Sequence, residues 1–346
     1  MALETSILNQ GRIANILGTH YGIGCADVER LPLGSANCYR VLDGEKYYFL
    51  KEFQSDFSED DLTREAGVVD YLASHGIPVA RFLPTLQNAW FVDCEGHMIA
   101  LSEYIDGITY GYDDMPPRRL CDLAAMLGQL HATLRDYPLP VDMGQTWLDA
   151  YSAEKTAQSY DALLATAAAR MSDPNTPQIL TDLTYKKDLA YRLEEYKKYY
   201  DGVTYNATHG DYQGCQLIWK DDGIRAVIDF SSARTLPVVW EVMRSFVQSS
   251  EVCRRDAKVD LAALCDYVRT YMRYFPLSRT DLDAMPYVYL FQLARSRYGY
   301  PQYLDGTSED SMGLLHFATW RTAMCREVES RAGEIARALL NLSAKN

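Results

Sequence analysis

Two stretches of the chain decide the fold: residues 208–216 read THGDYQGCQ, and residues 227–233 read VIDFSSA. The segment between them predicts a β-hairpin, because two strand-like runs flank the turn sequence KDDG. A strand that leaves the Asp211 loop and returns over a similar length brings Asp229 back beside Gln216 and Asp211. The sequence therefore predicts two carboxylates and one amide oxygen at one end of a hairpin.

Oxygen atoms in such a group suit phosphoryl transfer. Mg²⁺ prefers oxygen ligands and usually takes one or two carboxylates together with substrate phosphates. A carboxylate that does not bind the metal can orient a hydroxyl group and accept its proton. The alternative is that Asp211 and Asp229 only form turns at the two ends of a structural hairpin.

The motifs HGD at 209–211 and IDF at 228–230, with Ala233 three residues later, resemble a known family. It comprises the aminoglycoside phosphotransferase-like and choline kinase-like small-molecule kinases, and it includes the type II homoserine kinases. The resemblance implies an α+β, bilobal protein-kinase-like fold: a small β-rich N-lobe and a large helical C-lobe with an inserted β-hairpin. It also implies MgATP-dependent phosphorylation of a hydroxyl group, with Asp211 as the catalytic base and Asp229 as the principal Mg²⁺ ligand.

The first hundred residues are β-rich, and they place one lysine among apolar residues. The runs 38–42 and 46–53 predict a hairpin around Asp43-Gly44, and a helix is expected to follow from about residue 62. Lys51 needs a partner or an anionic ligand in that setting, and Glu65 on the inward face of the helix can pair with it. The functional interpretation has Lys51 on the α- and β-phosphates and Glu65 fixing it. The alternative is a lysine that extends to solvent from an edge strand.

Two further segments correspond in order to parts of this family. The loop LGSANCY at 33–39 lies where a phosphate-binding loop is expected, with Gly34 and Ser35 at the phosphates, although one glycine also fits an ordinary hairpin. The segment LSEYIDG at 101–107 resembles the hinge between lobes. By that resemblance the adenine bonds to the Glu103 carbonyl and the Ile105 amide.

The change in character along the chain predicts two lobes. We expect an N-terminal nucleotide-binding lobe over 1–104 and a C-terminal helical catalytic and substrate-binding lobe over 105–346, with the hinge at 103–107 and the nucleotide in the cleft between them. Six long helices are predicted in the second lobe, over 146–171, 176–200, 239–252, 256–274, 279–298 and 313–343. His131, at the end of a further helix, is expected to be a buried structural residue under the catalytic loop.

Composition excludes several other classes. The 346 residues carry a net charge of −13, which disfavours nucleic-acid binding. No apolar run is long enough to span a membrane, and the start MALETS lacks the features of a secretory signal, so a cytoplasmic protein is expected. The eight cysteines are scattered without the spacing of a zinc site. The acidity favours a cationic substrate, or it is simply the ordinary charge of a cytosolic protein.

Two functional hypotheses follow from different classes. The first is an active kinase that uses Mg²⁺ and ATP, with GTP as the alternative nucleotide, to phosphorylate a small amino alcohol, amino acid or aminoglycoside-like compound. The second is a catalytically impaired pseudokinase that binds a nucleotide or a partner. Gln216 motivates it, because the family has Asn there as the second metal ligand and Gln is one methylene longer. A protein kinase is disfavoured, since no Ala-Pro-Glu segment follows Asp229.

Overall fold

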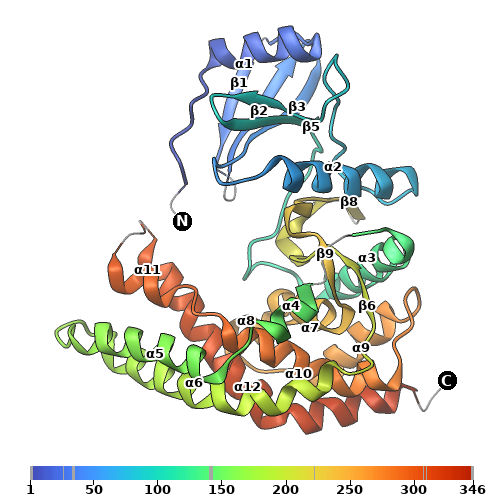
Figure 1. The fold of residues 1–346 in the computed structure, drawn as a ribbon. Helices are drawn as coiled ribbons and strands as arrows, with labels where there is room; N and C mark the ends of the chain where they lie inside the picture. The colour runs from blue at the N-terminus through green and yellow to red at the C-terminus, as the bar shows by residue number, and fades with distance from the viewer. Residues whose placement is uncertain are drawn as a thin grey trace. The chain divides into compact units, whose positions relative to one another are not determined.

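A computed structural model describes most of the chain, and its contacts divide the chain into two compact units (Figure 1). Unit 1 comprises Met1–Thr109 and Gln216–Ala233, and unit 2 comprises Tyr110–Cys215 and Arg234–Asn346. The predicted hinge over 103–107 stays a prediction. The described residues are 3–25, 27–32, 36–139, 143–221, 223–306, 308 and 310–343.

Unit 1 is built on an antiparallel sheet of five strands in the order β1-β2-β3-β5-β4. The predicted hairpin is confirmed as β2–β3, where Asp43 pairs with Lys46 and Gly44 adopts the left-handed φ of 60° that the tight turn requires. The strands are β1 Asp27–Leu31, β2 Asn37–Asp43, β3 Lys46–Glu52, β4 Val92–Cys94 and β5 His97–Glu103.

Helices cover both faces of this sheet. Ile99 and Leu101 of β5 share a core cluster with α1 (Gln10–Ile16) and the π-helical turn Leu17–Tyr21, whereas Met98 and Ala100 share one with α2 (Glu59–Ser74). Alternate strand residues point to opposite faces, so α1 and α2 lie on opposite sides. The helix expected from residue 62 begins at Glu59, because the Ser58 hydroxyl accepts the Asp61 amide as an N-cap.

The second predicted hairpin is also confirmed, as β7 (Leu217–Lys220) and β8 (Gly223–Val227). It belongs to unit 1 although it is inserted between helical segments. Ile108 and Trp219 exchange two backbone hydrogen bonds of 2.8 Å, and the Val227 amide donates to the Pro78 carbonyl at 2.8 Å. A short 3₁₀ turn, Phe230–Ser232, follows the hairpin and places the IDF motif at its end.

Unit 2 is mainly helical, with one small antiparallel ladder between β6 (Tyr205–Thr208) and β9 (Arg234–Pro237). None of the helices in the described ranges combines the length and apolar character needed to cross a membrane. The α-helices are α3 Leu120–Thr133, α4 Met143–Asp149, α5 Ala153–Ala168, α6 Thr176–Tyr196, α7 Val238–Ser249, α8 Glu251–Asp256, α9 Leu261–Tyr271, α10 Arg279–Arg295, α11 Tyr300–Asp305 and α12 Ser311–Ser343. The short 3₁₀ segments are Pro117–Arg119, Leu134–Asp136, Lys197–Tyr200 and Gly214–Gln216.

Candidate active site

In unit 1, the lysine of β3 meets the aspartate that follows β8. The Lys51 ammonium lies 3.4 Å from Asp229 Oδ1, and it also sits over the Phe53 ring at 4.5 Å from the centroid. Burial alone would lower the pKa of Lys51, but the carboxylates of Glu65 and Asp229 raise it above its ordinary value. The lysine is therefore a fixed positive charge at neutral pH, as an anion-binding role requires.

Glu65 is buried beside this pair without bonding to the lysine directly. Its exposed fraction is 3%, and the Phe230 amide donates to its carboxylate. Among the described residues, the carboxylate within ion-pair distance of Lys51 is that of Asp229, so the predicted Lys51–Glu65 contact is replaced by a longer-range interaction. Burial and the charge of Asp229 raise the pKa of Glu65 to about 7, because Lys51 compensates them only in part.

Asp229 and Gln216 come together at the end of the hairpin, as predicted. The Gln216 amide nitrogen lies 3.5 Å from Asp229 Oδ2, and the Ser231 hydroxyl donates to Oδ1 at 2.9 Å. Asp229 adopts a left-handed φ of 64°, a conformation that aspartate tolerates better than most residues. The predicted approach of Asp211 to this group stays a prediction.

This donor set fits Mg²⁺ better than a softer metal. Asp229 supplies a carboxylate and Gln216 an amide oxygen, and both are hard ligands of the kind Mg²⁺ prefers. The described residues contain no group of three or more His, Cys, Asp or Glu side chains placed to hold a metal, which argues against an all-protein cage. A site with one carboxylate instead matches a cation held partly by substrate phosphates. Because the amide nitrogen of Gln216 faces Asp229, its oxygen reaches a shared cation only after a half-turn of the amide.

The remaining nucleotide-site predictions fall in two places. Gly34 and Ser35 lie outside the described residues. Glu103 is the last residue of β5, where its amide donates to the Arg81 carbonyl at 2.9 Å. Ile105 lies two residues beyond that strand, in extended chain. Their proposed contacts with an adenine stay predictions.

In unit 2, Asp211 lies in the loop after β6 and bonds to an arginine that the sequence analysis did not single out. Arg244 of α7 donates through Nη2 to Asp211 Oδ1, and Gln213 Nε2 lies 3.5 Å from Oδ2. The Asp211 amide donates to His209 Nδ1 at 3.2 Å. The guanidinium of Arg244 therefore lies on one side of the carboxylate, and the amide of Gln213 lies on the other.

A buried glutamate of α7 fixes this loop from below. Glu241 is fully buried, and its carboxylate accepts the amides of His209 at 3.1 Å and of Gly210. It also pairs with His131 Nε2 at 2.8 Å, which confirms His131 as a buried structural residue. Burial alone would raise the pKa of Glu241, but the bond from His131 lowers it below its ordinary value. The loop is held by an ionised carboxylate with several donors.

The spacing of Glu241 and Arg244 is the signal that could have found both residues. They lie three positions apart on α7, so they project from one face of that helix. A helix that follows the IDF motif and carries an acid and a base on one face is a candidate support for the HGD loop. Sequence alone does not show which loop that face meets.

Comparison with known sequences places the chain in an enzyme family. The sequence profile of the phosphotransferase enzyme family matches residues 27–275, well over half of the chain. The matched range includes Lys51, Asp211 and Asp229. No curated protein sequence matches the chain significantly.

Solved structures share the fold along almost the whole chain. Spectinomycin phosphotransferase in complex with ADP and spectinomycin is 14% identical, with a TM-score of 0.64 over 96% of this chain and 99% of that one. A microcompartment-associated aminopropanol kinase is 16% identical, with a TM-score of 0.65 over 94% and 98%. The amicoumacin kinase hAmiN, in complex with AMP-PNP, Ca²⁺ and amicoumacin, is 14% identical, with a TM-score of 0.62 over 94% of each chain. These likenesses confirm the bilobal kinase-like fold.

Proposed function

The chain belongs to the phosphotransferase enzyme family, and from that premise we propose that it transfers the γ-phosphate of ATP, or of GTP, to a hydroxyl group of a small molecule. The observation that carries this proposal is the group in unit 1 formed by Lys51, Asp229 and Gln216, with Glu65 buried behind it. A nucleoside triphosphate and its metal require a cation for the phosphates and oxygen ligands for the metal. Lys51 supplies the cation, and Asp229 and Gln216 supply the oxygen ligands.

Each unit 1 residue has a distinct role in this proposal. Lys51 binds the α- and β-phosphates through its ammonium, and Glu65 keeps that ammonium charged from a distance. Asp229 and Gln216 would hold Mg²⁺, which when bound neutralises negative charge on the β- and γ-phosphates. The nucleotides in the similar structures, ADP in one and AMP-PNP with Ca²⁺ in another, support a nucleotide and a divalent cation here.

Asp211 acts on the acceptor in unit 2. Its carboxylate accepts a hydrogen bond from the acceptor hydroxyl and orients it toward the γ-phosphorus. It takes the hydroxyl proton as the new oxygen–phosphorus bond forms and the bond from the γ-phosphorus to the departing nucleoside diphosphate breaks. Glu241 fixes the loop that carries Asp211 through the amides of His209 and Gly210, so the carboxylate keeps its position during this step. Arg244 bonds to Oδ1, and Oδ2, which lies 3.5 Å from the amide nitrogen of Gln213, is the oxygen that we assign to the acceptor.

The acceptor class is a small hydroxyl compound, such as an amino alcohol, an amino acid or an aminoglycoside-like molecule. The substrates named for the similar structures, spectinomycin and aminopropanol among them, support this range. The test is turnover of ATP and GTP against a panel of these compounds, with Mg²⁺ or with a chelator. We expect nucleoside diphosphate and phosphorylated acceptor in equal amounts, and no product when the metal is removed.

The same panel separates an enzyme from the pseudokinase alternative. Nucleotide binding measured by calorimetry, with no transfer to any acceptor, would favour the pseudokinase. Failure to bind any nucleotide would contradict both hypotheses.

A further inference from the structure

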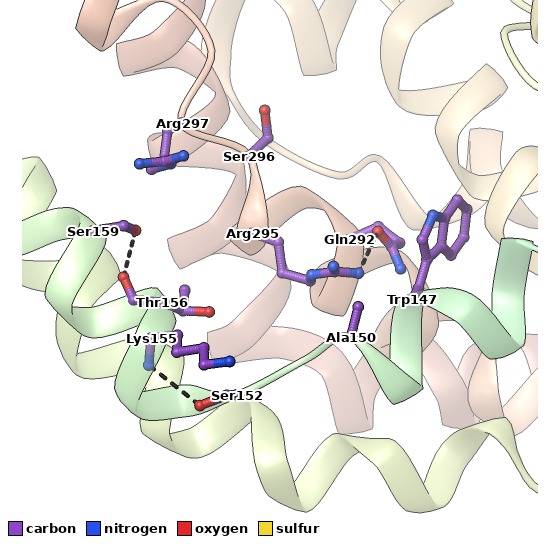
Figure 2. A pocket seen from close by; sticks show the side chains of 10 residues that line it. All are labelled: Trp147, Ala150, Ser152, Lys155, Thr156, Ser159, Gln292, Arg295, Ser296 and Arg297. Atoms are coloured by element: carbon purple, nitrogen blue, oxygen red, sulfur yellow. Dashed lines mark hydrogen bonds between the residues drawn. The ribbon is translucent and has the colours of Figure 1, made fainter.

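The helical unit contains a pocket with an unusual charge. It has a volume of about 410 Å³, within the range of small-molecule sites. Figure 2 shows side chains from α4, from the start of α5 and from the end of α10 around it. The lining residues are Trp147, Ala150, Ser152, Lys155, Thr156, Ser159, Gln292, Arg295, Ser296 and Arg297.

The lining carries three positive charges and no negative one. Lys155, Arg295 and Arg297 supply the charges, and the other polar groups are hydroxyls and one amide. The whole chain has the opposite bias, with 47 acidic residues against 34 basic ones. Three cations without an acid in one pocket of an acidic protein therefore call for a specific cause.

These cations lack the carboxylate partners that other basic residues of the same unit have. Within the described ranges, no ion pair joins Lys155, Arg295 or Arg297 to an acidic side chain, whereas Arg192 pairs with Glu329 at 2.6 Å. Two carboxylates that are near the lining residues in the sequence or by contact have other partners and do not line the pocket. Glu154 accepts the Ser152 hydroxyl, and Glu194 pairs with Lys197 at 2.7 Å.

Arg295 is held by one hydrogen bond and two aromatic rings. Its guanidinium donates to the Gln292 side chain at 3.3 Å and lies over the rings of Tyr151 and Phe291, at 5.6 and 5.5 Å from their centroids. These contacts fix the side chain but leave its charge uncompensated. Burial lowers the pKa of Arg295, and an anion in the pocket would oppose that shift.

Two features outside the lining add to the positive potential. The buried Lys186 donates its ammonium to the carbonyl of Ser296, a lining residue, and so places a further charge behind the pocket wall. Burial lowers the pKa of Lys186 to about 8, which still leaves most of it protonated at pH 7. In addition, the first turn of the 16-residue α5 contributes lining residues, and helix N-termini favour anions.

The pocket is connected to the loop of Asp211 by direct contacts. Trp147 packs edge-on against Trp240 of α7 at a centroid distance of 5.2 Å, and Arg244 lies over the Trp240 ring at 5.7 Å. Arg244 is the residue that bonds to Asp211. One lining residue of the pocket, Trp147, is therefore joined to the proposed base through Trp240 and Arg244.

We propose that this pocket binds an anionic group, a carboxylate or a phosphate, of the hydroxyl acceptor, with Arg295 as its main contact and Lys155 and Arg297 at its rim. This inference rests on the proposed function, and it names a substrate class: hydroxyl compounds that carry an acidic group. It opposes the cationic acceptor that the overall charge of the chain allows.

The first experiment compares acceptors that differ only in charge. The panel pairs hydroxy acids and hydroxyalkyl phosphates with their neutral amides or alcohols, and KM and kcat are measured for each. For anionic acceptors we expect Arg295→Gln to raise KM by about 10- to 100-fold with little change in kcat, and Arg295→Lys to recover part of the loss. Neutral acceptors should be unaffected. The comparison of carboxylates with phosphates identifies which anion is preferred.

A matched control lies on the same helix. Arg279→Gln removes one positive charge from the exposed start of α10, roughly 24 Å along the helix from Arg295. It should leave KM for anionic acceptors unchanged. Equal effects of the two substitutions, or an unchanged KM in Arg295→Gln, would overturn the proposal.

The second experiment measures binding without catalysis, so that it does not depend on kinase activity. Trp147 lines the pocket, and its fluorescence should change on titration with acetate or inorganic phosphate in the wild type but not in Arg295→Gln or Trp147→Phe. If no acceptor is phosphorylated but this titration is observed, the proposed function fails while the anion site stands. If phosphoryl transfer occurs and neither anion binds, the pocket assignment is wrong.

Discussion

Each unit holds an aspartate beside a cation with a buried glutamate nearby, yet the two glutamates differ in the hydrogen bonds that they accept. Glu241 of unit 2 accepts the amides of the Asp211 loop and an imidazole hydrogen bond from His131. In unit 1, Glu65 receives the amide of Phe230, and its Oε2 is buried with no hydrogen-bond partner in the described ranges. The shifts in pKa follow this contrast: the pKa of Glu241 is lowered and that of Glu65 is raised to about 7.

The difference separates a structural support from a ligand site. A buried carboxylate with several donors is stable as it stands and holds its surroundings rigid. A buried carboxylate with one oxygen unpartnered is compensated only in part, here by Lys51, and a charged cluster of that kind is a functional-site candidate. On this reasoning the Asp211 loop is held rigid by its support, whereas the Lys51–Asp229–Glu65 group is the candidate ligand site.

The largest expected effect comes from removing the two aspartates separately. Asp229→Ala should abolish metal-dependent nucleotide binding, because it deletes the main carboxylate for Mg²⁺. Asp211→Asn should lower kcat by about 10²- to 10⁴-fold and leave nucleotide affinity unchanged, because it removes only the proton acceptor. Calorimetric titration with ATP at several Mg²⁺ concentrations, together with steady-state kinetics, checks both. If Mg²⁺ dependence persisted in Asp229→Ala, the metal assignment would be lost.

The next effect compares the two glutamates directly by isosteric substitution. Glu241→Gln places an amide NH₂ against buried donors and should lower the free energy of unfolding by about 3–5 kcal/mol, the usual loss when one partner of a buried ionic group is removed. Glu65→Gln should not lower it at pH 7 and should raise it, by at most about 3 kcal/mol, because the neutral amide avoids the cost of ionising a buried carboxylate and its NH₂ group displaces no donor. Urea denaturation measures both variants. Similar losses in the two would remove the distinction between support and ligand site.

The sequence patterns predicted elements that depend on local order, and they missed elements that depend on contacts between segments far apart in the chain. Both hairpins and α2 follow from turn residues and apolar spacing. Helix α1 was not predicted, because the apolar role of Ile13 and Leu17 appears only when they cover the sheet. Strand β9 was also missed, since it is short, ends in Pro237 and pairs with β6 far along the chain.

The contacts of the candidate site show the same division: the sequence predicted the local one and missed the distant ones. The motifs predicted that Asp229 meets Gln216, because one hairpin connects them. They did not predict that Asp229 is the direct partner of Lys51, since 178 residues separate the two and only the packing of the hairpin on the sheet joins them. The bond from Arg244 to Asp211 was missed for the same reason, because it spans 33 residues and two elements.

A third prediction uses pH to isolate Glu65. Its pKa is raised from 4.5 to about 7 in the folded chain, so the folded state binds its proton more tightly than the unfolded state does. The resulting stability is present below about pH 4.5 and is lost as pH rises through about 7, by at most about 3 kcal/mol. Glu241 adds no pH dependence in this window, because its lowered pKa confines the loss of its stabilisation to below about pH 4.5.

Glu65→Gln removes this titration and serves as the measurement. Hydrogen exchange of the β2 and β3 amides between pH 5 and pH 8, corrected for intrinsic rates, should show wild-type unit 1 losing protection relative to the variant as pH rises. A constant difference across the range would mean that Glu65 is not held protonated by its surroundings.

The smallest effect tests two glutamines that make the same contact in the two units. Gln216 Nε2 lies 3.5 Å from Asp229, and Gln213 Nε2 lies 3.5 Å from Asp211. Both distances exceed those of good N–H···O bonds, about 2.7–3.2 Å, so neither contact adds much stability. Gln216→Asn and Gln213→Asn should therefore each change the free energy of unfolding only modestly.

The two substitutions should differ in how activity depends on Mg²⁺. Gln216→Asn restores the shorter ligand of the family and should preserve or raise activity at limiting Mg²⁺. Gln213→Asn should leave the Mg²⁺ dependence unchanged. The Mg²⁺ concentration at half-maximal turnover measures this in both variants. If it moves equally in the two, Gln216 does not bind the metal and only closes the loop.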